Sequence, residues 1–221
     1  MTHKTGDVFG VTRDLPITYA ERKHVDDRLL DNLTRDKHVI IFGSSKQGKT
    51  CLRRHCLQEN DYILVQCQNA WDIAKLSEAI LKAAGCEVEI SNSRTSEGRS
   101  KLEVKATGGF SLLGLGKTEI QGGSEGERTD SQSRSFEPLE LDPSDPNDLV
   151  RALRGIDFAK FIVLEDFHYL PQETQEQFAF ALKTVHEISR ITFIVVAVWR
   201  EENRLNPNGS SPGSAGEAAK V

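Results

Sequence analysis

The sequence predicts an α/β fold in which a parallel β-sheet lies between two layers of helices. Four short apolar segments have the composition of buried strands, since they are continuous and rich in β-branched residues. The longer segments between them repeat their apolar residues at helical spacing. Alternating strands and helices are typical of a three-layer sandwich, and 221 residues with 38% hydrophobic content are enough to bury its core.

Each predicted strand is a run of apolar residues with few polar interruptions. Such runs are expected where both faces of a sheet are covered. Their lengths, six to nine residues, suit strands better than helices. The predicted strands cover residues 38–43, 62–67, 160–167 and 191–199.

Four helices are predicted from apolar residues that recur three and four positions apart. Gly85 is a natural helix C-cap, and Pro171 suits a first helical turn. The first helix has one apolar face formed by Val25, Leu29, Leu30 and Leu33. The predicted helices cover residues 19–33, 51–58, 70–85 and 171–189.

Two regions interrupt this alternation of strands and helices. Residues 91–135 are polar and glycine-rich, and the alternating stretch 101–106 predicts a β-hairpin-like insertion. From Asn206 onward the sequence is of low complexity and is predicted to be disordered. The predicted organisation is a lead-in at 1–18, a core domain at 19–205 that contains the insertion, and a tail at 206–221.

Composition favours a cytoplasmic protein. A net charge of −5 disfavours a globally basic nucleic-acid surface, although it leaves a local patch open. The four cysteines have neither Cys-x-x-Cys nor metal-ligand spacing, so reduced thiols are expected. The N-terminus lacks the apolar stretch of a signal peptide, and the longest apolar run, 191–199, is too short to span a bilayer. No membrane partner is expected.

A glycine-rich loop between the first strand and the next helix carries the most specific motif. Gly43-x-x-x-x-Gly48-Lys49-Thr50 matches the Walker A pattern of phosphate-binding loops. Its glycines allow close backbone approach, and its N–H groups would face a phosphate at the helix N-terminus. Lys49 is expected to contact the β- and γ-phosphates, and Thr50 to ligate Mg²⁺. The predicted binding residues are Gly43, Ser44, Ser45, Lys46, Gln47, Gly48, Lys49, Thr50 and Cys51.

A second Gly-Lys-Thr triplet occurs at residues 116–118. The residue five positions before Gly116 is Ser111 rather than glycine, and no apolar strand precedes it. We therefore expect a glycine-rich turn there and not a second nucleotide site.

Two acidic residues end the third predicted strand. Of Glu165 and Asp166, one could hold a magnesium ion while the other polarises an attacking water molecule. Asp followed by Glu is the usual order beside such loops, and here the order is reversed. Glu165 would then serve the metal and Asp166 the water. In the alternative, Asp166 is the metal ligand and the base lies elsewhere. Both acids and Thr50 are candidate metal ligands.

Arg200 follows the fourth predicted strand, at the end expected to lie beside a γ-phosphate. A guanidinium group there could detect that phosphate, although Arg200 could also be an exposed turn residue. Asn203 and Arg204 are weaker candidates for this role. His168, two residues after Asp166, is expected to be a surface or helix-start residue rather than a phosphate sensor.

Together these motifs resemble those of P-loop ATPases of the AAA+/STAND group. IIFGSSKQGKT is similar to their Walker A, FIVLEDFHYL to Walker B with its two acids exchanged, and VVAVWRE to the strand that carries sensor 1. Residues 19–33 resemble the helix before Walker A, which implies that Arg22 borders the adenine pocket. The resemblance covers residues 19–90 and 136–204. It implies a P-loop NTPase core without the family's helical lid.

The resemblance implies binding of ATP with Mg²⁺ and slow hydrolysis, as a nucleotide-dependent switch or assembly ATPase. Such proteins act in an oligomer or with partner domains, and the 91–135 insertion would suit such a contact, or is a tolerated surface insertion. The alternative is a nucleotide-binding interaction module that does not hydrolyse. The absence of an Asn-Lys-x-Asp motif favours ATP over GTP. A small-molecule kinase is least favoured, because no arginine-rich lid is seen.

Overall fold

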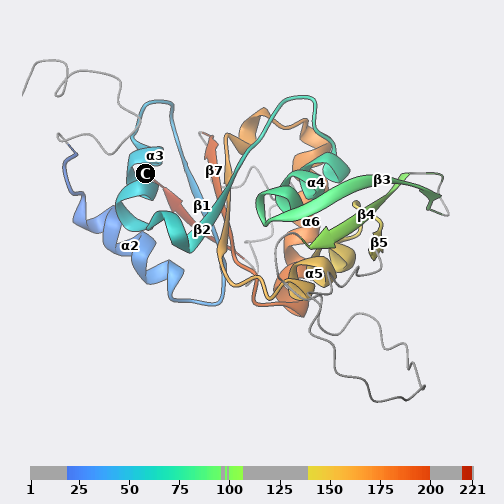
Figure 1. Ribbon diagram of the computed structural model, residues 1–221. Helices are drawn as coiled ribbons and strands as arrows, with labels where there is room; N and C mark the ends of the chain where they lie inside the picture. Colours follow the sequence, from blue (N-terminus) through green and yellow to red (C-terminus); the bar gives the residue numbers. More distant parts are fainter. Residues whose placement is uncertain (1–18, 96–97, 99, 107–138, 200–215, 221) are drawn as a thin grey trace, which may run out of the picture.

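A five-stranded parallel sheet forms the centre of the protein (Figure 1). The computed structural model describes residues 19–95, 98, 100–106, 139–199 and 216–220. Every neighbouring pair of strands in this sheet is parallel, in the order β2-β6-β7-β1-β8. The α/β class with a parallel sheet is thus confirmed, and all four predicted strands are present. The strands are β1 (His38–Gly43), β2 (Tyr62–Gln66), β6 (Phe161–Glu165), β7 (Phe193–Val198) and β8 (Gly216–Lys220).

Helices cover both faces of this sheet, as the sequence predicts (Figure 1). Alternate residues of a strand point to opposite faces. In β7, Ile194 and Val196 pack into the buried cluster beneath α2 and α3, whereas Phe193 and Val195 pack beneath α4, α5 and α6. The helices are α2 (Lys23–Leu33), α3 (Lys49–Cys56), α4 (Ile73–Ala83), α5 (Pro146–Gly155) and α6 (Gln172–Ile188).

Helix α5 is not among the helices that the sequence predicts. Its N-cap is Asp145, whose carboxylate accepts a hydrogen bond from the Asn147 backbone N–H at 2.9 Å. Pro146 occupies the first turn, where its missing N–H costs nothing. Leu149 and Leu153 are buried against the core. The helix is short, and the polar, proline-rich segment before it resembles a loop.

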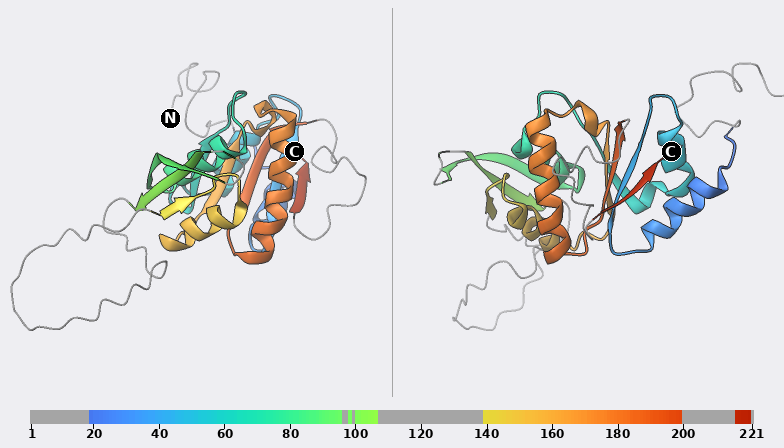
Figure 2. Two further views of the ribbon diagram at one scale, coloured as in Figure 1. Left: turned by 90° about the vertical axis from the view of Figure 1, so that its right-hand side faces the viewer. Right: turned by 180° about the vertical axis from the view of Figure 1, so that it is seen from behind.

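A second, antiparallel sheet lies beyond α4 and α5 on one side of the molecule (Figures 1 and 2). It contains β3 (Cys86–Arg94), β4 (Ser100–Ala106) and β5 (Leu139–Leu141). The alternating stretch 101–106 lies in β4, with Leu102 and Val104 buried in the α4–α5–α6 cluster. The hairpin begins at Cys86, earlier than the predicted insertion at 91–135. Residues 107–138, with the second Gly-Lys-Thr triplet, lie outside the described residues.

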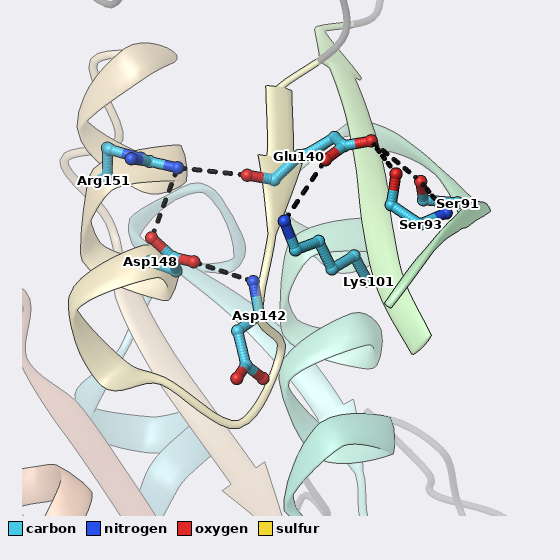
Figure 3. A network of polar contacts seen from close by, with 7 residues as sticks. All are labelled: Ser91, Ser93, Lys101, Glu140, Asp142, Asp148 and Arg151. Carbon is cyan, nitrogen blue, oxygen red and sulfur yellow. Dashed lines mark hydrogen bonds and ion pairs between the residues drawn. The ribbon is translucent and has the colours of Figure 1, made fainter. Parts of the chain in front are cut away.

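Polar contacts join the three strands of this small sheet to α5 (Figure 3). The Glu140 carboxylate accepts hydrogen bonds from the Ser93 hydroxyl at 2.7 Å and the Ser91 hydroxyl at 3.1 Å. Arg151 of α5 donates to the Glu140 carbonyl oxygen at 3.1 Å. The Asp148 carboxylate of α5 accepts from the Asp142 backbone N–H at 2.7 Å. These contacts tie the outer sheet to the helical layer behind it.

Strand β8 differs from the prediction of a disordered tail over residues 206–221. Gly216–Lys220 pair in parallel with β1, in a register that matches Gly216 with His38 and Lys220 with Phe42 (Figure 2). Glycine, glutamate and alanine have low strand propensity, so composition alone does not predict this strand. The predicted lead-in at 1–18 lies outside the described residues.

Two further findings concern the cysteines and the helices. All four cysteines, Cys51, Cys56, Cys67 and Cys86, are free thiols, as predicted. Among the described residues, the helices are all too short or too polar to cross a membrane.

Candidate nucleotide-binding site

The glycine-rich loop joins β1 directly to α3. Gly43 ends the strand and Lys49 begins the helix, with Gly48 as the N-cap. Gly48 has φ 78° and ψ 23°, a left-handed conformation that is strained for residues with a Cβ. No side chain caps this end of α3. The first N–H groups of the helix are therefore left for a ligand to accept from.

The loop and the two acidic residues lie around one cleft. This cleft has a volume of about 280 Å³. Strand β7 lies between β1 and β6, so the carboxyl ends of all three strands meet at this edge. The structure therefore brings together the two predicted motifs, which are 115 positions apart at Thr50 and Glu165. The cleft is lined by Ser45, Lys46, Gln47, Gly48, Lys49, Thr50, Cys51, Glu165, Asp166, Val196, Ala197 and Val198.

Lys49 is folded back onto its own loop. Its side chain is buried, and its Nζ atom donates hydrogen bonds to the carbonyl oxygens of Gly43 at 3.2 Å and Ser44 at 2.7 Å. Burial lowers the pKa of Lys49, while the negative charges of Asp166 and Glu165 act in the opposite direction. The ammonium group is thus held at the mouth of the loop without an ion pair to either acid.

Thr50 contacts Glu165 and thereby links the loop to the acidic strand. The Thr50 hydroxyl donates to Glu165 Oε1 at 2.5 Å. On the other carboxylate oxygen, Arg53 Nε donates to Oε2 at 3.0 Å. Sequence reasoning missed Arg53, although it lies three residues after Thr50 on α3, which places both side chains on the same side of the helix. The structure places Glu165, and not Asp166, beside the Thr50 hydroxyl.

Asp166 adopts a conformation that is uncommon for a residue with a side chain. Its φ is 55° and its ψ 33°, in the left-handed region. Its carboxylate accepts a hydrogen bond from the Gln66 side-chain amide of the neighbouring strand β2. This contact joins the second acid to the edge strand of the sheet. Gln66 is a further site residue that the sequence did not indicate.

Arg22 lies against the loop at Gln47 and Gly48. Its Nη1 atom donates to the Gln47 carbonyl oxygen at 3.1 Å, and its Nη2 atom lies 3.9 Å from the position that a Cβ on Gly48 would occupy. Nη2 is buried and has no hydrogen-bond partner among the described residues. The Asp26 carboxylate orients this segment, accepting from the Arg22 backbone N–H and the Tyr19 hydroxyl, each at 2.9 Å. An unpaired buried N–H group aimed at the loop is a candidate ligand contact.

His168 was expected to be a surface or helix-start residue, and it begins no α-helix but lies in the short 3-10 turn Phe167–Tyr169. His168 Nδ1 accepts a hydrogen bond from the Val198 backbone N–H at 3.3 Å, so this imidazole fastens the turn after β6 to the end of β7. Its ring also lies 4.3 Å from the Tyr169 ring, between centroids. Arg200, Asn203 and Arg204 lie outside the described residues.

The donor set fits a nucleotide phosphate with magnesium. An uncapped helix N-terminus, Lys49 and the unpaired Arg22 N–H are suited to anions. The Thr50 hydroxyl and the Glu165 carboxylate offer oxygen ligands, which magnesium prefers. The described part of the chain holds no cluster of three or more His, Cys, Asp or Glu side chains that could form a metal site. Magnesium at nucleotide sites uses one or two carboxylates together with phosphate oxygens, so such a cluster is not required.

Comparisons with known proteins give a distant structural likeness. No family model matches the chain, and no curated protein matches it. The chain is similar to the Orc1 protein of Aeropyrum pernix, whose structure was solved in complex with DNA, with a TM-score of 0.48 and 14% sequence identity. The likeness covers 93% of this chain and 46% of that one, so the chain spans about half the length of Orc1. A likeness this remote indicates neither a function nor a partner.

Proposed function

We propose that this chain binds ATP with Mg²⁺ and hydrolyses it slowly, as a nucleotide-dependent switch or assembly ATPase. The observation that carries the proposal is the meeting of Thr50 and Glu165, at 2.5 Å, in the cleft beside the glycine-rich loop. A glycine turn with no ligand would not require a buried lysine or a carboxylate from a distant strand at its mouth. The resemblance to the AAA+/STAND group is part of this proposal.

Each side chain of the cleft has a role in this proposal. Lys49 exchanges its two carbonyl acceptors for phosphate oxygens, and the first N–H groups of α3 hold the same phosphates. Thr50 and Glu165 would hold the magnesium ion, which would neutralise phosphate charge. Asp166 would orient and polarise a water molecule, once its contact with Gln66 is released. Arg22 would border the adenine, and Arg200 would contact the γ-phosphate.

A second candidate is a nucleotide-binding interaction module that does not hydrolyse. The engagement of both acids favours it: Glu165 is bound by Thr50 and Arg53, and Asp166 is bound by Gln66. A base that stays hydrogen-bonded to a side-chain amide has less capacity to accept a proton from water. Binding and hydrolysis therefore require separate tests.

A pair of measurements separates the two candidates. Binding of ATP is measured by calorimetry, and turnover is measured at several protein concentrations, for the wild type, Lys49→Ala and Asp166→Ala. Lys49→Ala should weaken ATP binding by about 2–3 kcal/mol, because charge-assisted contacts to phosphate are lost. Lys37→Ala is the matched control, since it removes a lysine just before the opposite end of β1. GTP should compete only weakly with ATP for the site.

Three outcomes decide the matter. If Lys49→Ala binds ATP as tightly as the wild type, both candidates are wrong. If the wild type binds ATP but turns over no faster than Lys49→Ala at any concentration, the ATPase proposal fails and the interaction module stands. A rate that rises with protein concentration supports catalysis in an oligomer.

The proposed partners and location extend this function. A second copy or another protein would contact the 91–135 insertion, whose described strand β4 carries the part-exposed charges Lys101, Glu103 and Lys105 on its outer face. Binding to nucleic acid stays open, although the net charge of −5 does not favour it. A cytoplasmic location is part of the proposal.

A further inference from the structure

Arg53 is a buried charge inside the candidate site. Its side chain is 2% exposed. It is also the largest of the fully buried side chains among the described residues. A buried guanidinium group is costly unless it is paired and hydrogen-bonded. Arg53 meets this need with an ion pair from Nε to Glu165 Oε2 at 3.0 Å. Its Nη1 atom donates to the Tyr62 hydroxyl at 2.6 Å, and its guanidinium carbon lies 5.0 Å from the centre of the Tyr62 ring.

Positive charges outnumber negative ones at the site before any ligand binds. Lys46 and Lys49 line the cleft and Arg53 pairs with Glu165, against the two negative charges of Glu165 and Asp166. Arg53 lies on the side of Glu165 away from the open cleft and does not line it. Its place behind the carboxylate differs from that of Lys49, which lies at the loop where phosphates would bind. Arg53 therefore acts on Glu165 rather than on an incoming nucleotide.

We propose that Arg53 is a built-in counterion that weakens magnesium binding at Glu165. This inference rests on the proposed function and deepens it. Glu165 offers Oε1 to a metal ion while Oε2 stays bound to Arg53, so a divalent ion would meet a carboxylate whose charge is already compensated. The ion would also be repelled by the guanidinium group. Nucleotide would then be held largely by the loop and Lys49, with a small contribution from magnesium.

Arg53 has two opposing effects on a metal ion, and their magnitudes decide the sign. Holding Glu165 in one orientation favours metal binding, and second-shell contacts of this kind are worth about 10- to 100-fold in affinity. A unit positive charge within a few ångströms of a divalent ion opposes binding by more than about 100-fold at an effective dielectric constant of about 20. Thr50 already orients Glu165 from the other oxygen, which reduces the first effect. Repulsion is therefore the larger effect.

The test measures how strongly magnesium and ATP favour each other's binding. For each protein, the Kd of ATP is measured in EDTA and in saturating Mg²⁺. The coupling ratio is the Kd in EDTA divided by the Kd in Mg²⁺, so a higher ratio means that magnesium strengthens ATP binding more. Any change in ATP affinity that is the same in both buffers cancels in this ratio. The affinity of magnesium for free ATP is the same for every variant, so it cancels when the ratios of two proteins are compared. The wild-type ratio should be below about 10, and Arg53→Met should raise it about tenfold or more.

Three further variants control for folding and charge. Arg53→Gln is neutral but keeps an N–H donor for Glu165, so it should raise the ratio as Arg53→Met does and serves if Arg53→Met fails to fold. Arg53→Lys keeps the positive charge and should stay within about threefold of the wild type. Arg54→Met removes an exposed cation from the same helix and should leave the ratio unchanged. Thermal melting checks that each variant is folded.

The outcomes separate this inference from the proposed function. If the neutral variants lower the ratio or leave it unchanged, or if the wild-type ratio exceeds about 100, Arg53 does not weaken magnesium binding and the inference is overturned. If the wild type binds ATP neither in EDTA nor in Mg²⁺, the proposed function itself is wrong. A ratio that rises for Arg53→Met and Arg53→Gln but not for Arg53→Lys supports the counterion.

Discussion

The stability of the protein should depend on keeping His38 neutral. His38 is 1% exposed at the start of β1. Its Nδ1 atom accepts a hydrogen bond from the Phe193 backbone N–H at 3.1 Å, and its Nε2 atom lies 2.9 Å from the Leu182 carbonyl oxygen. A carbonyl oxygen can only accept, so Nε2 carries the proton and Nδ1 carries none. Protonation of Nδ1 would place two N–H groups against each other.

The size of the effect follows from the pKa of this imidazole. Burial lowers the pKa of His38 from 6.5 to about 4, the Leu182 carbonyl opposes this change, and the nearby charge of His186 adds to it. Between these two values the unfolded state binds the proton more readily than the folded state. Stability is therefore complete above pH 6.5 and is lost as the pH falls toward 4. The contribution of His38 to the free energy of unfolding that depends on pH is about 3 kcal/mol, and most of it is lost by pH 4.5.

The assay is urea unfolding at pH 7.5, 6.5, 5.5 and 4.5 for the wild type and His38→Asn. The variant should be less stable by about 1–3 kcal/mol at pH 7.5, because it loses the contact with Leu182 and part of the buried ring. Its stability should then fall less steeply than that of the wild type, so that the two curves converge toward pH 4.5. His186→Asn is the control, since its ring is adjacent to His38, at 5.8 Å between centroids, yet less buried.

Parallel curves would refute this reasoning. If the wild type and His38→Asn lose the same stability between pH 6.5 and 4.5, within about 0.5 kcal/mol, the pH dependence comes from other groups. If His186→Asn alone abolishes the steep fall, the titrating residue is His186 and not His38.

Three other predictions concern single positions. Asp72→Ala should destabilise the protein by about 1 kcal/mol and lower Tm by about 2–4 °C, because the Asp72 carboxylate caps α4 by accepting from the Lys75 N–H. An unchanged Tm would contradict this prediction. Gly48→Ala should weaken ATP binding more than tenfold, since φ 78° is strained for alanine, and calorimetry would reveal wild-type affinity if this is wrong. Burial raises the pKa of Cys67 to about 12, so this thiol should react with a thiol reagent only when the protein unfolds. Cys51 is part-exposed and should react in the folded protein, and mass spectrometry of the native protein after labelling checks both cysteines.

The elements with strong local signals could be predicted from the sequence. Strand β1 and the loop after it combine a continuous apolar run with glycines at fixed spacing, and these signals depend only on nearby residues. The position of Glu165 beside Thr50 could also be predicted from the sequence, because the carboxyl ends of parallel strands meet at one edge of a sheet.

The parts that were missed depend on partners far along the chain. Arg53 has the sequence of an ordinary surface arginine, and its burial depends on Glu165, 112 positions later, and on the Tyr62 hydroxyl. Gln66 contacts Asp166 only because β2 pairs with β6. Strand β8 is made of small and polar residues, so its formation follows from the unpaired edge of β1 rather than from its own propensity.

The strand order also determines when the glycine-rich loop can take shape during synthesis. β1 is made before both of its partner strands: Val39 pairs with Ile194 on one side and Glu217 on the other, each more than 150 positions later in the chain. Contacts between residues so far apart form slowly, because a long loop must close first. A growing chain therefore carries the loop through the synthesis of more than 150 further residues before both strands that flank β1 can pair with it.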